Sequence, residues 1–322
     1  MKIIFAAGGT GGHINPALAA AGEIRDNYPD CEILFIGAKN KMESELVPKA
    51  GFAFKAISIS GFQRKISIKN LFRNIATVWR LIISLFAVRS IIKNFAPDVV
   101  VGFGGYVSGP VVRAAAKMGI KTVIHEQNAF PGVTNKMLAK KADAVMLTVP
   151  AAAKYLECKN EPVVTGLPVR SEILAADRDF ARAELGIKAN QKVIFSFGGS
   201  LGARTINNSM VSLISKLHEN SDIRFIHGYG QYGKWVPEKL KEAGVDITKD
   251  NIDVREYIFD MDKCLAAADL VICRSGASTL SEIEAVGRAS ILIPSPNVSE
   301  NHQYHNAMAL SDVQLQLQYL TV

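Results

Sequence analysis

Two segments of this 322-residue chain share one arrangement, in which an apolar run leads through a glycine-rich loop into a helical pattern. The first is "KIIFAAGGTGGHINPALAA", from residue 2, and the second is "VIFSFGGSLGARTINNSM", from residue 193. Continuous apolar runs are typical of strands buried on both faces of a parallel sheet. Glycines let the loop backbone adopt positive φ and let a ligand approach it closely. A strand, a glycine loop and a helix N-terminus in succession commonly hold an anion on backbone N–H groups.

The first loop differs from the common nucleotide-binding fingerprints. Its letters are GGTGGH rather than GxGxxG, and no Lys-Ser or Lys-Thr pair follows, so it is not a Walker loop. Pro16 suits the first turn of a helix over residues 16–27, while Thr10 and His13 add side-chain donors to the loop. A tight turn without a ligand is the alternative. A histidine at a strand's carboxyl end is expected to face a cleft, so we interpret the loop as ligand-binding.

Strand and helix patterns alternate along the whole chain, which predicts an α/β protein with parallel sheets. Its length exceeds one ordinary core, and Gly166 and Pro168 interrupt the pattern, so we expect two domains, 1–166 and 167–322. Each resembles a doubly wound nucleotide-binding domain, and the two are expected to face each other across a cleft. Helices are predicted at 16–27, 68–94, 203–217 and 278–287; strands at 2–7, 32–38, 53–59, 98–103, 121–126, 144–149, 162–165, 192–198, 223–228, 252–258, 270–274 and 289–294.

Cysteine usage and hydropathy restrict the compartment. The four cysteines are far apart and form no CxxC pair, which indicates neither a disulfide framework nor a zinc site. We therefore expect a reducing, cytoplasmic compartment. The apolar run before the first glycines is too short for a signal peptide, and no apolar stretch approaches the ~20 residues of a spanning helix.

The whole chain has a formal net charge of +7, and its basic residues are concentrated in one interval. No acidic residue lies between Glu45 and Asp98, and the predicted helix 68–94 combines a wide apolar arc with basic positions. Packing on the sheet would explain part of that arc. We predict that Arg73, Trp79 and Arg80 contact an anionic membrane surface. Nucleic acid is not expected as a partner, because no module that binds it is recognisable.

Two residues of the second half have two interpretations each. Glu282, in "CRSGASTLSE", is either a capping-box carboxylate at a helix start or an acceptor of hydrogen bonds from a ribose diol. Ser200, beside the second glycine pair, either hydrogen-bonds a phosphate or is a helix N-cap.

Seven segments together resemble the MurG family of bacterial cell-wall glycosyltransferases, in order, over about residues 1–310. The resemblance implies a GT-B fold and transfer of N-acetylglucosamine from UDP-N-acetylglucosamine to lipid I, giving lipid II, without a cofactor. It also implies peripheral attachment to the cytoplasmic face of the cell membrane. The segments are "GGTGGHINPALA", "GFGGYVSGP", "HEQNAFPGVTNK", "TGLPVR", "FGGSLGAR", "CRSGASTLSE" and "NHQYHNA".

The resemblance also implies roles for individual residues. Uracil is expected near Ile258, the ribose on Glu282, the diphosphate near Arg170 and Ser200, and the sugar hydroxyls on Gln303. The residues implied for the acceptor side and catalysis are His13, Tyr106, Glu126 and Asn128. The residues implied for the donor are Thr10, Gly11, Gly12, Asn128, Arg170, Ser200, Ile258, Ala277, Ser278, Thr279, Leu280, Ser281, Glu282 and Gln303.

The implied chemistry is substitution at the anomeric carbon with inversion, through an oxocarbenium-like state. His13 is our candidate for the general base, because imidazole titrates near neutral pH. Asp260 and Asp262 imitate a metal-binding DxD motif, but a helix N-terminus explains them better, and we predict no catalytic metal.

The last residues, "MALSDVQLQLQYLTV", do not resemble the family's continuation, so we expect its C-terminal helix to be missing. Two alternatives remain: a related lipid glycosyltransferase with another UDP-sugar or acceptor, and a non-catalytic UDP-sugar-binding protein. A dinucleotide oxidoreductase is a more distant third.

Overall fold

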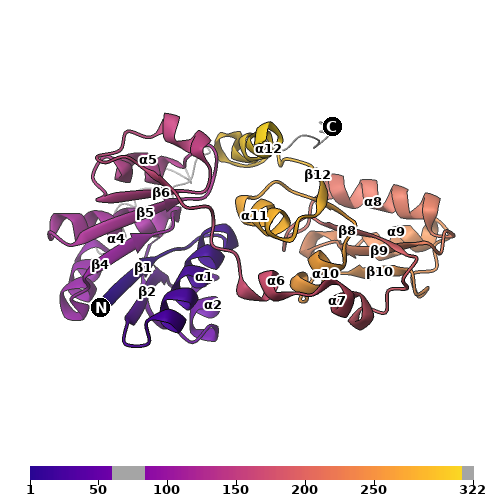
Figure 1. Ribbon diagram of the computed structural model, residues 1–322, viewed down its shortest axis with the longest axis horizontal. Helices are drawn as coiled ribbons and strands as arrows, with labels where there is room; N and C mark the ends of the chain where they lie inside the picture. Colours follow the sequence, from indigo (N-terminus) through magenta and orange to yellow (C-terminus); the bar gives the residue numbers. More distant parts are fainter. Residues whose placement is uncertain (60–83, 314–322) are drawn as a thin grey trace, which may run out of the picture. The chain divides into compact units, whose positions relative to one another are not determined.

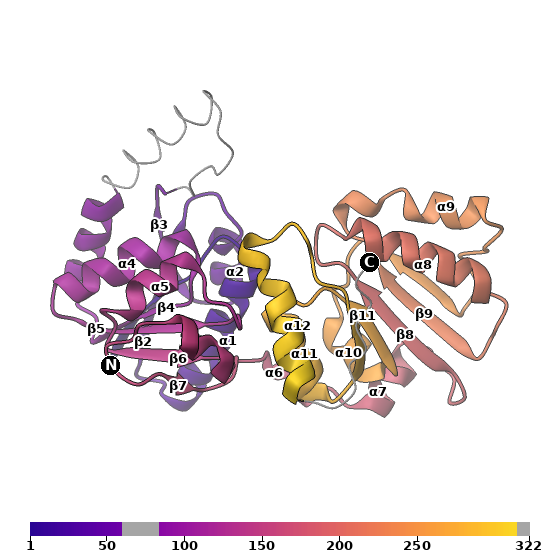
Figure 2. The same ribbon diagram turned by 90° about the horizontal axis from the view of Figure 1, so that it is seen from above.

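The computed structural model describes residues 1–59 and 84–313 and divides the chain into two compact units, Met1–Pro168 and Val169–Val322. Each unit contains one parallel sheet with helices on both faces (Figures 1 and 2).

The first unit is built on a seven-stranded sheet in the order β3-β2-β1-β4-β5-β6-β7. Every pairing is parallel, and the central strand β1 pairs Ile4 with Leu34 on one side and with Val100 on the other. The strands are β1 (Lys2–Ala6), β2 (Glu32–Ala38), β3 (Ala53–Ile57), β4 (Val99–Gly102), β5 (Lys121–Glu126), β6 (Ala144–Leu147) and β7 (Val163–Val164).

Alternate residues of β1 enter two separate cores, one on each face of this sheet. Phe5 stacks on Phe35, with ring centroids 5.1 Å apart, in the core that also contains Ala17 of α1. Ile4 packs on the opposite face with Val107 of α4. The helices are α1 (Gly11–Asn27), α2 (Glu43–Lys49), α4 (Gly105–Lys117), α5 (Val133–Ala139) and the 3-10 helix η1 (Pro150–Tyr155), and residues 84–95 are also helical.

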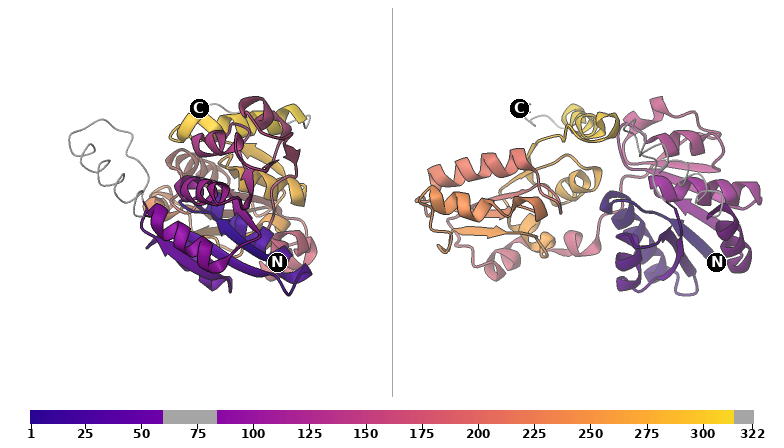
Figure 3. Two further views of the ribbon diagram at one scale, coloured as in Figure 1. Left: turned by 90° about the vertical axis from the view of Figure 1, so that its left-hand side faces the viewer. Right: turned by 180° about the vertical axis from the view of Figure 1, so that it is seen from behind.

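The second unit repeats the plan with five parallel strands in the order β10-β9-β8-β11-β12. The helices α8 and α9 cover one face, and α7, α10 and α11 pack on the other (Figures 2 and 3). The strands are β8 (Lys192–Phe197), β9 (Ile223–Gly228), β10 (Ile252–Arg255), β11 (Leu270–Cys273) and β12 (Ala289–Leu292). The helices are α6 (Ser171–Ala175), α7 (Arg178–Glu184), α8 (Arg204–Leu217), α9 (Val236–Glu242), α10 (Met261–Ala267), α11 (Ala277–Val286) and α12 (His302–Val313), with 3-10 turns η2 (Gln231–Gly233) and η3 (Ser299–Asn301).

The predicted strands are all confirmed, and α8 and α11 begin within one residue of the predicted starts. The predicted start of the first helix is wrong, because α1 begins at Gly11 and places Pro16 in its interior. Thr10 has extended backbone, with φ −147°, and its carbonyl accepts the N–H groups of His13 and Ile14. The second pair of glycines therefore forms a helical first turn rather than a loop. Of the predicted helix 68–94, only the end from residue 84 lies within the described residues, and it is helical.

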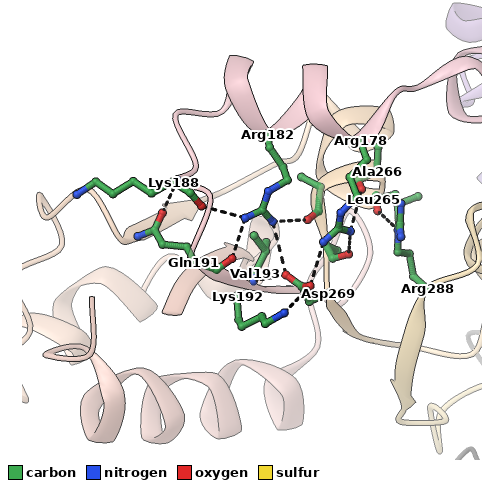
Figure 4. Close-up of polar contacts among 12 residues, drawn as sticks. Arg178, Arg182, Lys188, Gln191, Lys192, Val193, Leu265, Ala266, Asp269 and Arg288 are labelled. Atoms are coloured by element: carbon green, nitrogen blue, oxygen red, sulfur yellow. Dashed lines mark hydrogen bonds and ion pairs between the residues drawn. The ribbon is translucent and has the colours of Figure 1, made fainter. Parts of the chain in front are cut away.

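Asp269, directly before β11, fastens α7 to the sheet of the second unit (Figure 4). Its carboxylate accepts the N–H of Val193 at 2.9 Å and a guanidinium hydrogen of Arg178 at 2.9 Å, and Arg182 lies 3.6 Å away. Burial acts to raise the pKa of Asp269, but the Val193 N–H and the Arg178 and Lys192 charges outweigh it and leave the pKa lowered. The ionised carboxylate therefore stabilises the fold.

We predict that Asp269→Asn lowers the free energy of unfolding by about 2 kcal/mol at neutral pH, because the charge facing the guanidinium groups is lost. A carboxyl whose pKa is lowered by folding contributes stability that is present above its unfolded pKa, ~3.9, and is lost as pH falls through the folded value. Urea unfolding at several pH values should therefore show the variant and the parent converging in acid.

The matched control is Asp26→Asn, which removes the same charge from an exposed side chain that pairs with Arg25. Its effect should stay within about 0.5 kcal/mol. A loss for Asp269→Asn that is independent of pH would contradict this account.

Candidate functional site

Each sheet contains one point where the winding direction reverses, and many of the predicted site residues lie in the loops and helix starts beside these two points. In the first unit the reversal lies between β1 and β4, and in the second unit between β8 and β11. Loops leave such a point in opposite directions, which opens a crevice at the carboxyl ends of the strands.

The fully buried Glu43 of α2 holds the first glycine loop in place. Its two carboxylate oxygens accept the N–H of Gly9 at 3.3 Å and that of Ala38 at 3.0 Å. Thr10 occupies the N-cap position of α1 without making a side-chain capping bond. The N–H groups of Gly11 and Gly12 point out of the helix start without an intrahelical acceptor, so they can bind an anion or hydroxyl oxygen.

His13 lies in the first turn of α1 and begins a chain of hydrogen bonds. Its Nδ1 is 3.0 Å from Oε1 of Gln127, and Nε2 of Gln127 lies 3.2 Å from Nδ1 of His125. Nε2 of His125 in turn meets the carbonyl oxygen of Gly166 at 2.9 Å. Gln127 and His125 are buried, and burial lowers the pKa of His125 despite the bond to Gly166. His13 is half-buried, so its ring connects this interior chain to the surface.

Tyr106 is the predicted site residue that lies beside the first glycine loop. Tyr106, in the first turn of α4, is half-buried beside the first loop, where a side chain at Gly9 would meet its ring. Burial raises the pKa of Tyr106, and the charge of Glu43 adds to the rise.

The Glu126 carboxylate is buried and accepts four hydrogen bonds, from the N–H and the side-chain amide of Asn128, the N–H of Gly132 and the Asn135 amide. All four donors belong to the segment that follows β5. Glu126 therefore holds this loop in shape, and with it the neighbouring Gln127.

The N-terminus of α11 is an open set of donors in the second unit. The helix begins at Ala277, Gly276 is its N-cap, and no side chain caps it. The hydroxyl of Ser278 is buried without a hydrogen-bond partner in the described part of the chain. The N–H groups of the first turn, including that of Thr279, and this hydroxyl are suited to phosphate oxygens.

Two interpretations from the sequence are wrong. Ser200 is no N-cap, because α8 begins at Arg204 and Ala203 is its N-cap; Ser200 lies exposed on the second glycine loop. Glu282 is no capping-box residue, because it lies in the second turn of α11.

Glu282 and Arg170, both predicted donor contacts, meet each other. Nη2 and Nε of Arg170 lie 3.0 Å and 3.3 Å from Oε1 of Glu282, whose residue is only 8% exposed. Burial raises the pKa of Glu282, and the Arg170 charge opposes the rise. Within residues 1–59 and 84–313, no donor bonds its other oxygen, Oε2. That oxygen is available to a ligand hydroxyl.

Other residues predicted to contact the donor have side chains that are buried or hydrogen-bonded within the protein. The Ile258 side chain is buried in the core, and its exposed neighbours are Tyr257 and Phe259, whose rings lie 4.7 Å apart. Leu280 and Ser281 are buried in α11. Oε1 of Gln303 accepts the Ser295 N–H at 2.9 Å, which fixes the side chain against the loop after β12.

Asp260 is the N-cap residue of α10, as its position in the sequence suggested, but its carboxylate pairs with Arg255 at 2.6 Å instead of capping. Across the described residues, no cluster of three or more His, Cys, Asp or Glu side chains is placed to hold a metal ion.

The predicted membrane contacts Arg73, Trp79 and Arg80 lie outside the described residues. In the helical residues 84–95, Phe86 is 67% exposed. Arg89 and Lys93 are exposed as well. Among the helices that the structure describes, none is long and apolar enough to span a bilayer.

Three residues that shape the first unit's site were not predicted from the sequence: Glu43, His125 and Gln127. His125 and Gln127 belong to the segment "HEQNAFPGVTNK", so the sequence predicted the loop in which they lie but not their roles. Glu43 had no comparable signal, because its contact with the glycine loop joins residues 34 positions apart.

Comparisons with known proteins agree with this architecture. Residues 3–147 match the glycosyltransferase family 28 N-terminal domain, and residues 193–321 match the family 28 C-terminal domain. Two relatives, from Desulforamulus reducens and Acetivibrio thermocellus, are 46% and 47% identical over 97% and 96% of this chain and 83% and 82% of their own. Both are named UDP-N-acetylglucosamine--N-acetylmuramyl-(pentapeptide) pyrophosphoryl-undecaprenol N-acetylglucosamine transferase.

Among solved structures, Acinetobacter baumannii MurG is 30% identical, with a TM-score of 0.72 over 97% of this chain and 83% of that one. The UDP-GlcNAc 2-epimerase of Neisseria meningitidis, 12% identical with a TM-score of 0.62 over 97% of this chain and 92% of its own, shares the fold alone. With both family domains present in order and each built on its own parallel sheet, this chain belongs to glycosyltransferase family 28 and has the GT-B fold.

Proposed function

We propose that this chain transfers N-acetylglucosamine from UDP-N-acetylglucosamine to the 4-hydroxyl of the muramyl sugar of lipid I, forming lipid II for peptidoglycan. The observation that carries the proposal is the similarity to relatives named for this transfer, at 46–47% identity across nearly the whole chain. The donors and acceptors at the two reversal points are of the kinds that this reaction needs.

The second unit supplies groups suited to UDP. The open N–H groups of α11 and the unpartnered Ser278 hydroxyl would hold the diphosphate. Oε2 of Glu282 would accept hydrogen bonds from the ribose. The main chain at Ile258, whose neighbours in the sequence are the exposed Tyr257 and Phe259, would meet the uracil.

The first unit supplies a base. The 4-hydroxyl attacks the anomeric carbon opposite the departing UDP, so an α-linked donor gives a β-1,4 product. His13 takes the hydroxyl proton, while Glu126 keeps the loop after β5 in place. As the C1–O bond breaks, charge grows on the diphosphate, where Arg170 and the α11 N–H groups stabilise it.

Membrane attachment is part of the proposal. The exposed Phe86 and the exposed cations Arg89 and Lys93, on the helical residues 84–95, are suited to a surface that is apolar beneath anionic headgroups. An enzyme with a lipid-linked acceptor works at such a surface, so we place it peripherally on the cytoplasmic face of the cell membrane.

Turnover with UDP-N-acetylglucosamine and a lipid I analogue tests the proposal. UDP and lipid II analogue should form together, and UDP-glucose should be used far less well. Another preferred UDP-sugar would favour the related lipid glycosyltransferase, UDP binding without turnover the non-catalytic alternative, and NAD binding without UDP binding an oxidoreductase.

Glu282→Gln should weaken UDP binding about tenfold, because a charged acceptor contributes ~1.5–3 kcal/mol to a hydrogen bond. Titration calorimetry with UDP measures the effect. Glu284→Gln, which makes the same change at an exposed position of the same helix, should bind UDP like the parent. Equal UDP affinity in both variants would exclude the ribose role of Glu282.

His13→Ala should lower kcat by about 100-fold or more and leave UDP affinity nearly unchanged, as expected for loss of a general base. His218→Ala, at the C-terminal end of α8, is the matched control and should retain kcat. If UDP affinity of His13→Ala collapses while kcat survives, His13 binds substrate but is not the base.

Arg89→Glu combined with Lys93→Glu should reduce binding to anionic vesicles at least tenfold, at ~1 kcal/mol for each basic residue near the surface. Vesicle co-sedimentation at low and high salt measures the change. Lys188→Glu with Lys241→Glu, at exposed positions of the second unit, alters net charge equally and should have a small effect. Equal losses in the two pairs would point to net charge rather than to this surface.

A further inference from the structure

A series of hydrogen-bonded residues in the interior of the first unit ends at His13, and the proposed reaction does not use it. It runs from Gly166 through His125 and Gln127 to His13, and these four residues come from three separate parts of the first unit. Because one end is a backbone carbonyl, which can only accept, the direction of every bond in the chain can be worked out.

The Gly166 carbonyl determines which ring nitrogen of His125 is protonated. Nε2 of His125 lies 2.9 Å from that oxygen, so this nitrogen carries the hydrogen. His125 is 2% exposed, and its ring stacks on Phe103 with centroids 5.2 Å apart. Burial lowers the pKa of His125, so the ring is neutral and Nδ1 keeps its lone pair.

The amide of Gln127 then has one allowed orientation. Its Nε2 faces two acceptors, the carbonyl of His125 at 3.0 Å and Nδ1 of His125 at 3.2 Å, and it has two hydrogens to donate. The opposite orientation would place Oε1 against both acceptors and leave no hydrogen bond on that side. Oε1 therefore faces Nδ1 of His13, and that nitrogen must carry the proton.

We infer that Gln127 and His125 are positioning residues that hold His13 in the Nδ1–H tautomer and so leave the lone pair on Nε2. The hydrogen bond made by one ring nitrogen decides which nitrogen is protonated. The consequence for catalysis rests on the proposed function, whereas the tautomer itself does not.

The surrounding backbone makes room for this bond. Gly104 has φ +90°, and a Cβ there would come within 3.0 Å of the His13 ring and 3.5 Å of Oε1 of Gln127. Gly105, at φ +75°, would place a Cβ against the carbonyl oxygen of Gly8. The two glycines after β4 thus let the ring and the amide approach each other.

The titratable groups around this loop are otherwise engaged. Glu43 of α2 accepts two backbone N–H groups, Glu126 of β5 accepts four hydrogen bonds, and Tyr106 of α4 lies beside Gly9. Within the part of the chain that the structure describes, the hydrogen-bond partner of the His13 ring is the side-chain oxygen of Gln127. A neutral amide thus takes the position that a carboxylate takes in a Ser-His-Asp triad.

The attacking hydroxyl gives its proton to Nε2 of His13, and its oxygen electron pair forms the new bond to the anomeric carbon while the electron pair of the C1–O bond leaves with UDP. His13 becomes imidazolium, and its Nδ1–H remains on Oε1 of Gln127. The proton later passes to solvent.

Long-range ¹H–¹⁵N NMR of the histidine rings tests the inference on the unliganded full chain at about pH 8, where histidines of ordinary acidity are neutral. His13→Gln identifies the His13 signals by their loss. We expect a protonated Nδ1 and an unprotonated Nε2 in the parent. Gln127→Met, which removes the amide at similar volume, should shift His13 away from that tautomer, and so should His125→Phe, which preserves the stack on Phe103.

The activity readout is a kcat lowered about 10- to 100-fold with unchanged UDP affinity, a smaller effect than the ~10⁴ for loss of a charged orienting group. Gln127→Glu retains an oxygen for Nδ1 of His13, and its second oxygen must carry a proton in order to donate to the His125 acceptors. With that proton, the variant should keep the tautomer and recover part of kcat. Gln191→Met is the control for losing a buried glutamine, because Gln191 is 4% exposed and hydrogen-bonded elsewhere; it should leave the His13 signals and kcat unchanged.

A protonated Nε2 in the parent, or a Gln127→Met variant with unchanged His13 signals, would overturn the inference. If the parent forms no lipid II analogue, the proposed function fails, and the nitrogen signals still decide the tautomer. If Gln127→Met changes the tautomer but retains the full kcat, the tautomer does not matter for catalysis.

Discussion

The reversal of winding direction in each parallel sheet is the constraint on which the other features depend. All strands of a parallel sheet end at one edge, so the loops that follow them are brought together whatever their separation along the chain. At β1 and β4 this collects the first glycine loop, the start of α4 and, one strand further, the loop after β5. At β8 and β11 it collects the second glycine loop and the start of α11. The sheet topology, and not local sequence alone, therefore places the N-termini of α1 and α11 and their polar neighbours at the carboxyl edges of their own sheets.

Two buried carboxylates, Glu43 and Glu126, fix the loops of the first unit, whereas the half-buried Asp269 fastens α7 to the second sheet. Their environments separate structural from ligand-binding roles. Asp269, Glu43 and Glu126 each accept backbone N–H groups, and their oxygens are engaged within the protein. Glu282 has one cationic partner, on one oxygen, and burial raises its pKa. A buried carboxyl with an unengaged oxygen, on a helix that follows a strand's carboxyl end, is a strong candidate for a binding group.

Patterns with a short range could be predicted from the sequence. The strands were predicted correctly because short, mostly apolar runs bounded by turn residues leave few alternatives. The start of α1 could not be predicted, because glycine disfavours helices, and what extends the helix to Gly11 is the Thr10 carbonyl geometry. The Gln127 chain joins residues as far as 114 positions apart, and no local pattern encodes such a contact. Ile258 was expected at the end of a strand over 252–258, but β10 ends at Arg255, and the burial of Ile258 depends on packing against the rest of the core.

Hydrogen–deuterium exchange of the full chain, with and without each substrate, shows whether the substrates bind at the two reversal points. If each sheet binds its substrate at its own reversal point, UDP should slow exchange in residues 199–203 and 275–282. A soluble lipid I analogue should slow exchange in residues 8–13 and 127–132. Protection by UDP confined to the far ends of the strands, or to helices that do not follow β8 or β11, would contradict the account.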